Sequence, residues 1–145
     1  MTLCLEHEQY HEFDVDGETI ALRIDLACWD GDNRLLILDW KTGSWENELS
    51  GRAQLATYSL WAHSCLGLPV DRIIPVVVGL ESGNVSRFRA TEQDLQYVLD
   101  IVHADRALVD KYSVEAGFPP SSDPARCSAC GFLENCAEGR DSVGL

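Results

Sequence analysis

The chain has 145 residues, which is long enough for one domain with a sizeable buried core. Its hydrophobic content of 46% is ordinary for a globular protein, whereas its formal net charge of −13 makes it strongly acidic. No apolar run approaches the roughly 18 residues that a transmembrane helix needs, which excludes such a helix. Residues 1–8 lack the basic and apolar regions of a signal peptide, so we expect a cytoplasmic protein without a membrane partner.

The acidic charge weighs against strong stand-alone binding of nucleic acid, because phosphate neutralisation by basic side chains supplies much of that affinity. Only two lysines are present, Lys41 and Lys111. Two explanations remain open. Either the surface is simply acidic and well solvated, or basic groups that hold nucleic acid lie on another domain or partner.

A β-hairpin is predicted at the start of the chain. The dipeptide Asp16-Gly17 is a strong turn signal, and it joins expected strands at residues 6–15 and 18–28. In the second strand the even-numbered apolar residues from 20 to 26 share one face, whereas Arg23 and Asp25 share the other.

A third strand and a helix are expected next. Residues 35–41 form a short apolar run of the kind buried within a sheet, so the first half of the chain is predicted to be a three-stranded meander. Residues 47–65 show helical spacing of apolar side chains, and Gly67 and Pro69 end that pattern.

The rest of the chain is predicted to form two more strands and a long helix. Residues 72–80 and 84–89 are predicted strands, and Pro75 in the first suggests a bulge or an unpaired edge. A long helix is predicted to begin after Thr91, its expected N-cap. Residues 117–124 form an irregular linker. The outline is a mixed α/β domain with a small tail.

Two carboxylates and a lysine are expected to converge on the meander. Asp39 and Lys41 are two residues apart on a strand and therefore face one side, whereas Trp40 faces the other. Asp25, which is expected to end the neighbouring strand of the meander, can lie beside Asp39. Carboxylate oxygens suit Mg²⁺ or Mn²⁺, and the backbone carbonyl of Trp40 is a further candidate ligand. The alternative is that Asp39 and Lys41 are an ordinary exposed pair on an edge strand.

Three segments in order carry a resemblance to a known family. They are Leu22-Arg23-Ile24-Asp25, Leu38-Asp39-Trp40-Lys41-Thr42-Gly43 and Gln54-Leu55-Ala56-Thr57-Tyr58. The sequence resembles the RecB-type exonuclease branch of the PD-(D/E)XK nuclease superfamily, which includes nuclease domains of recombination and CRISPR-associated exonucleases. The resemblance implies a restriction-endonuclease-like mixed central sheet flanked by helices.

The resemblance also implies roles for five residues. Asp25 and Asp39 would bind the metal ion, and Lys41 would orient the attacking water. Gln54 and Tyr58, four apart on one helical face, would position the substrate or the lysine. Helix packing is the alternative role for the latter two.

Six cysteines are present, and three of them, Cys127, Cys130 and Cys136, lie close together near the C-terminus. Thiolates at this spacing indicate a metal or cluster site. The resemblance implies a [4Fe–4S] cluster completed by a fourth, upstream cysteine, with Zn²⁺ as the alternative. Cys4 is the one cysteine upstream of the expected sheet, but it lies closer to Asp25 than the family pattern implies.

These features predict two domains, a nuclease-like core at residues 1–116 and a cysteine-rich metal or iron–sulfur tail at residues 117–145, packed on the core. The expected function is Mg²⁺- or Mn²⁺-dependent hydrolysis of phosphodiester bonds in DNA, by resemblance in single-stranded DNA or at free ends, during DNA processing, repair or defence. One alternative is a weak or inactive nuclease-fold module that binds DNA or a partner protein, within a larger complex that supplies the upstream helix and the fourth cysteine that the resemblance implies. Another is a small zinc-binding interaction protein.

Overall fold

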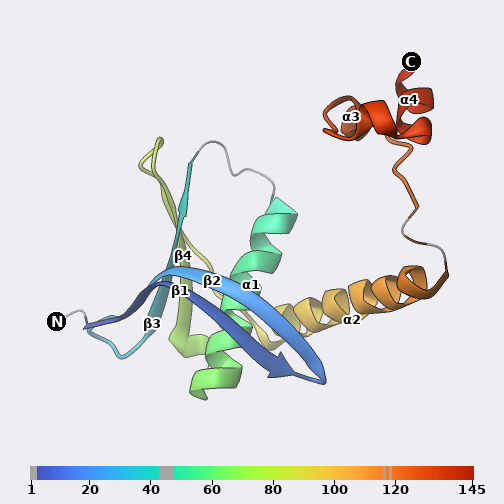
Figure 1. Ribbon diagram of the computed structural model, residues 1–145. Helices are drawn as coiled ribbons and strands as arrows, with labels where there is room; N and C mark the ends of the chain where they lie inside the picture. Colours follow the sequence, from blue (N-terminus) through green and yellow to red (C-terminus); the bar gives the residue numbers. More distant parts are fainter. Residues whose placement is uncertain (1–2, 43–47, 116, 118) are drawn as a thin grey trace. The chain divides into compact units, whose positions relative to one another are not determined.

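The computed structural model describes residues 3–42, 48–115, 117 and 119–145, and a mixed five-stranded sheet forms its centre (Figure 1). The strands lie side by side in the order of the sequence. Strands β3 and β4 pair in parallel, and the other neighbours pair antiparallel. The strands are β1 (Leu3–Val15), β2 (Glu18–Trp29), β3 (Leu35–Lys41), β4 (Ile73–Gly79) and β5 (Val85–Arg87).

Helix α1 (Glu48–Leu66) connects the two parallel strands, because a parallel pair needs a crossover. Its buried side chains pack on the sheet beside β4, β1 and β2. The helix ends at Gly67, which has a φ of 65° and provides the left-handed residue that commonly follows a helix. The core beneath α1 contains Ile24, Ile37 and Ile73, all without solvent exposure. This packing holds α1 across the carboxyl end of β3.

Helix α2 (Glu92–Glu115) begins with reciprocal capping hydrogen bonds. The Thr91 hydroxyl accepts from the Asp94 N–H at 3.4 Å, and the Asp94 carboxylate accepts from the Thr91 N–H at 2.9 Å. Arg52 of α1 donates to the same carboxylate, so the start of α2 is tied to α1. The predicted N-cap at Thr91 is therefore confirmed.

The chain forms two compact units, Met1–Ala104 and Asp105–Leu145. The first contains the sheet and the core. The second contains the end of α2, then α3 (Pro124–Ser128), the short 3₁₀ helix η2 (Leu133–Asn135) and α4 (Ala137–Val143). Within the described ranges no helix is both long and apolar enough to cross a membrane.

The prediction of a mixed α/β fold with a central sheet is confirmed, but two details were wrong. Strand β4 is not an edge or bulged strand, because it pairs continuously with β3 and also with β5. Pro75 is tolerated there because its carbonyl accepts from Phe88 N–H, so its missing N–H faces the end of the short β5. Asp25 does not lie near a strand end either, since β2 continues to Trp29.

Several expectations fall outside the described residues. These are Gly43 of the second family segment, the loop at Ser44, the start of the predicted helix at Asn47, and Phe118 of the linker.

Candidate active site

The site lies where β2 and β3 separate. The two strands pair only between Leu26–Trp29 and Leu35–Leu38. Beyond Leu38 the backbone N–H of Trp40 instead donates to Oδ2 of Asp25 at 2.8 Å. The Asp25 side chain therefore replaces the backbone carbonyl of β2 as the hydrogen-bond acceptor at this point. This brings the Asp25 carboxylate beside Trp40, the residue that follows Asp39.

Asp39 is the buried centre of the site, with only 4% of its surface exposed. Its Oδ1 accepts from the Tyr58 hydroxyl at 2.9 Å and from Nε2 of Gln54 at 3.2 Å. Its Oδ2 lies 2.8 Å from Nζ of Lys41. That approach is outside hydrogen-bond geometry, so among the described groups Oδ2 has an ion-pair partner but no hydrogen bond. A buried carboxylate oxygen in this state is stabilised by a further cation.

Gln54 joins the lysine to the tyrosine. Its Oε1 accepts from Nζ of Lys41 at 2.9 Å, and its Nε2 donates to the Tyr58 hydroxyl at 2.8 Å. Gln54 and Tyr58 are one turn apart on α1 and so reach the same end of β3. The half-buried lysine is held by this amide and by Asp39.

Tyr58 acts only as a neutral phenol in this arrangement. Burial raises its pKa well above the usual range, and the neighbouring Asp39 charge and hydrogen bond raise the pKa further. The phenol therefore stays protonated at any ordinary pH, and its O–H donates a hydrogen bond to Asp39. A smaller contribution from Asp25 to the same rise in pKa indicates that both carboxylates lie near the phenol.

The backbone carbonyl of Trp40 points to the β2 side of β3, where the two strands separate. Within a strand the N–H and C=O of one residue point to the same side. The Trp40 N–H points to Asp25 on the β2 side, whereas the next carbonyl, that of Lys41, accepts from Leu80 N–H on the opposite side. The Trp40 side chain is exposed, whereas that of Asp39 is buried.

Together these groups present the oxygen donors that Mg²⁺ and Mn²⁺ prefer, two carboxylates and a carbonyl. The structure brings together Asp25, Asp39, Lys41, Gln54 and Tyr58, all of them singled out from the sequence. No set of three or more His, Cys, Asp or Glu side chains converges on one point in the part of the chain that the structure describes. A site at Asp39 would therefore use two carboxylates and backbone or solvent oxygens.

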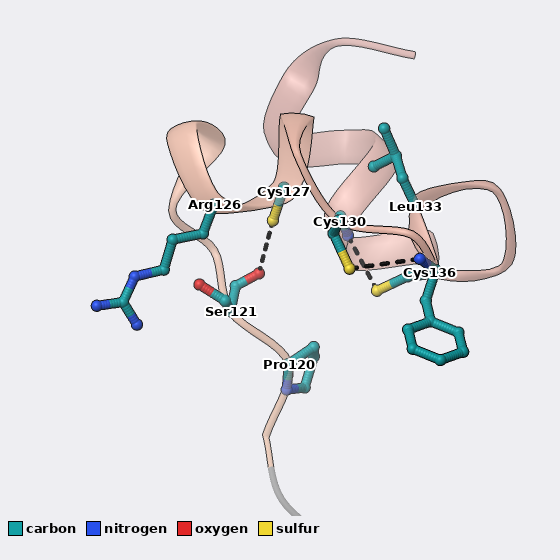
Figure 2. A pocket seen from close by; sticks show the side chains of 9 residues that line it. Pro120, Ser121, Arg126, Cys127, Cys130, Leu133 and Cys136 are labelled. Atoms are coloured by element: carbon teal, nitrogen blue, oxygen red, sulfur yellow. Dashed lines mark hydrogen bonds between the residues drawn. The ribbon is translucent and has the colours of Figure 1, made fainter. Parts of the chain in front are cut away.

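The three clustered cysteines line a cavity of about 240 Å³ in the second unit (Figure 2). Cys127 is buried, and its thiol donates to the Ser121 carbonyl at 3.3 Å. The sulfur of Cys130 accepts from Phe132 N–H at 3.5 Å, and that of Cys136 from Gly139 N–H at 3.3 Å. Backbone N–H groups directed at sulfur stabilise the thiolate form that binds metal.

Gly139 fits closely against one of these thiols. A Cβ added there would lie 3.3 Å from the Cys136 sulfur and 3.3 Å from Cδ1 of Leu133. The absence of a side chain therefore lets the backbone N–H approach the sulfur. Cys4, in contrast, lies on β1 directly opposite Cys28 of β2.

Sequence reasoning did not predict a groove of about 350 Å³ between β2 and α1. It is lined by Ala21, Leu22, Arg23, Gln54, Thr57 and Tyr58. A signal was present, because Arg23 is two residues before Asp25 on one strand. The groove itself is formed by β2 and α1 together, so no pattern within one element reveals it.

The family model of the PD-(D/E)XK nuclease superfamily matches residues 4–137. The chain belongs to this superfamily. Among solved structures, a "Putative exonuclease" from Eubacterium rectale shares the fold at 15% identity and a TM-score of 0.51, with 90% of this chain and 51% of that chain covered. The structure of SSO0001 matches at 18% identity and a TM-score of 0.47, with 92% of this chain and 60% of that chain covered. The chain thus spans little more than half of these proteins. No curated protein sequence matches it.

The Tyr58 hydroxyl should contribute to activity through Asp39. In Tyr58→Phe, Oδ1 of Asp39 loses one of its two hydrogen bonds, and we expect the cleavage rate to fall about tenfold, as for other groups that orient a metal ligand. Tyr97→Phe, which removes a hydroxyl from a partly exposed position on α2, is the matched control. Equal rates for the two variants in a Mn²⁺-dependent cleavage assay would contradict this role.

Proposed function

We propose that this member of the nuclease superfamily is a metal-dependent deoxyribonuclease that hydrolyses phosphodiester bonds. The observation that carries the proposal is the buried Oδ2 of Asp39, which pairs with Nζ of Lys41 at 2.8 Å but has no hydrogen bond among the described groups. The next residue, Trp40, binds the second carboxylate, that of Asp25, through its N–H. A divalent cation at this point would offset the cost of burying that charge.

Each residue has a distinct proposed task. Asp25, Asp39 and the Trp40 carbonyl would hold Mg²⁺ or Mn²⁺, which when bound lowers the pKa of water and stabilises charge on phosphate oxygens. Lys41 would orient the attacking water and offset the charge that develops on the phosphate. Gln54 fixes the ammonium group of Lys41, and Tyr58 fixes the carboxylate of Asp39.

By family resemblance the substrate is single-stranded DNA or DNA with free ends, and exonucleolytic cleavage in DNA processing, repair or defence is the proposed activity. The net charge of −13 supports a role for a larger assembly that supplies basic surfaces. The same charge favours the second candidate, a weak or inactive module that binds DNA or a partner protein.

The cysteine cavity is the proposed site of an iron–sulfur cluster. The three thiols line one cavity of about 240 Å³, and thiolates at this spacing suit an iron–sulfur cluster, with Zn²⁺ as the alternative. Residues 117–145 would then form a cofactor-bearing tail on a nuclease core at residues 1–116. The fourth ligand is left unassigned, since Cys4 lies beside Cys28.

The test is cleavage of end-labelled single- and double-stranded oligonucleotides by the purified chain with Mn²⁺, Mg²⁺ or EDTA. We expect cleavage of single strands that requires the metal and is lost with EDTA, because the carboxylates alone cannot activate water. Binding of DNA without cleavage under every metal condition would favour the non-enzymatic module.

A further inference from the structure

The groove between β2 and α1 adjoins the proposed active site. Its volume is about 350 Å³, at the lower end of the range of ligand pockets, which begins at roughly 300 Å³. Gln54 and Tyr58 line it and also donate to Asp39, so one wall of the groove is part of the site. A molecule held at Asp39 would therefore extend into this groove.

Most polar donors of the groove are already engaged. Both N–H bonds of the Gln54 amide are directed at Asp39 and Tyr58, and the Tyr58 hydroxyl donates to Asp39. The Thr57 hydroxyl donates to the Ala53 carbonyl at 2.8 Å. None of these groups can donate to a ligand without breaking a bond within the protein.

Arg23 is the one cationic residue among the described residues that line the groove, and its donors are available. Its Nη2 lies 3.7 Å from Oε2 of Glu8, and the two side chains are 65% and 74% exposed. A long pair between exposed groups is weak and exchanges readily with a better partner. A planar guanidinium is well suited to bind a phosphate through two parallel hydrogen bonds.

We propose that this groove binds the nucleotide that flanks the scissile phosphate, and that Arg23 holds the phosphate of that nucleotide. The inference rests on the proposed nuclease function and adds a positioning residue to it. Ala21 and Leu22 give the groove an apolar wall, which can contact the sugar or base without reading its sequence. Recognition here is therefore of the DNA backbone.

The experiment compares Arg23→Ala with wild type in Mn²⁺-dependent cleavage of a single-stranded oligonucleotide. We expect KM to rise about tenfold with kcat changed less than about twofold, because one charge-assisted contact to a flanking phosphate is lost. Fluorescence anisotropy titrations at several salt concentrations give the slope of log binding constant against log salt concentration. In Arg23→Ala the magnitude of this slope should be smaller by about one. Arg23→Lys should restore the slope and part of the affinity.

Two variants serve as controls. Arg87→Ala removes one exposed positive charge from β5, outside the groove, and should leave KM and the salt slope unchanged. Glu8→Gln removes only the ion-pair partner of Arg23 and should not weaken binding. A loss in Glu8→Gln equal to that in Arg23→Ala would show that Arg23 acts only through this pair, and would overturn the proposal.

The failure of each proposal is recognisable. If wild type cleaves DNA but Arg23→Ala keeps the wild-type KM and salt slope, the groove assignment is wrong and the nuclease function stands. If wild type does not cleave but binds the oligonucleotide with a salt slope that Arg23→Ala lowers, the nuclease function fails and the groove assignment stands. If wild type does not bind the oligonucleotide, the groove assignment is overturned.

Discussion

Asp39→Asn is expected to reduce metal-dependent DNA cleavage by roughly 10³-fold, the effect of removing a major electrostatic contributor to catalysis. The asparagine keeps the shape of the side chain, and its carbonyl oxygen can still accept from Tyr58 and Gln54 as Oδ1 does. What is lost is the charge on Oδ2, which has no hydrogen bond among the described groups, and with it the ion pair to the half-buried Lys41. Activity should therefore fall far more than stability.

Metal binding gives a second readout of the same variant. A ligand at about 100 times its Kd stabilises a protein by about 2.7 kcal/mol, so saturating Mn²⁺ should raise the Tm of the wild type by several degrees. Asp39→Asn should show little or no rise. The measurements are initial rates of cleavage and thermal melts with and without Mn²⁺.

Asp71→Asn is the matched control, since Asp71 is an exposed carboxylate next to the start of β4. It should keep both the wild-type rate and the response to Mn²⁺. Cleavage by Asp39→Asn at the wild-type rate would refute the site. Loss of cleavage with an unchanged response to Mn²⁺ would mean that Asp39 assists the reaction without holding the metal.

Local patterns predicted much of the candidate site. Alternation along β3 puts Asp39 and Lys41 on one side, and helical spacing puts Gln54 and Tyr58 on one face of α1. Both rules operate within one element and need no knowledge of the rest of the chain. The four side chains do meet in a single hydrogen-bonded network.

The position of Asp25 could not be derived in this way. It depends on the point at which β2 leaves β3, which is set by long-range pairing and by the packing of α1. The prediction from Pro75 was wrong for a related reason. The effect of a proline on pairing depends on which strand its missing N–H faces, and at Pro75 that strand is the short β5. The groove beside Arg23 likewise needs two elements, since β2 and α1 form its walls.

The proposed metal site predicts that the cysteine tail loses its fold when the metal is absent. In the described stretch 119–145 only Cys127 and Gly139 are buried, so this segment lacks an apolar core of its own. Small segments of this kind need a metal or a covalent link to fold. Structural metals supply roughly 10 kcal/mol of folding free energy in small domains, far more than the tail's hydrogen bonds would contribute.

We therefore expect Cys136→Ala, purified without oxygen, to lack iron and the broad visible absorption of an iron–sulfur cluster. Its tail should be cut by protease at least about tenfold faster than that of the wild type, because the metal contributes folding free energy only while it is bound. The melting of the sheet unit should change little. Cys65→Ala, which removes an exposed thiol near the end of α1, should keep the iron and the resistance to protease.

The metal content of the wild type decides between the two ligands proposed for the cavity. If the purified wild type contains zinc and no iron, the cavity holds a single zinc ion instead of a cluster. The tail of Cys136→Ala should then lose its fold because it no longer binds zinc. Wild-type protein that holds neither metal and whose tail resists protease would refute the proposed metal site. In that case the fold of the tail would not depend on a metal, and Cys136→Ala should leave its protease resistance unchanged.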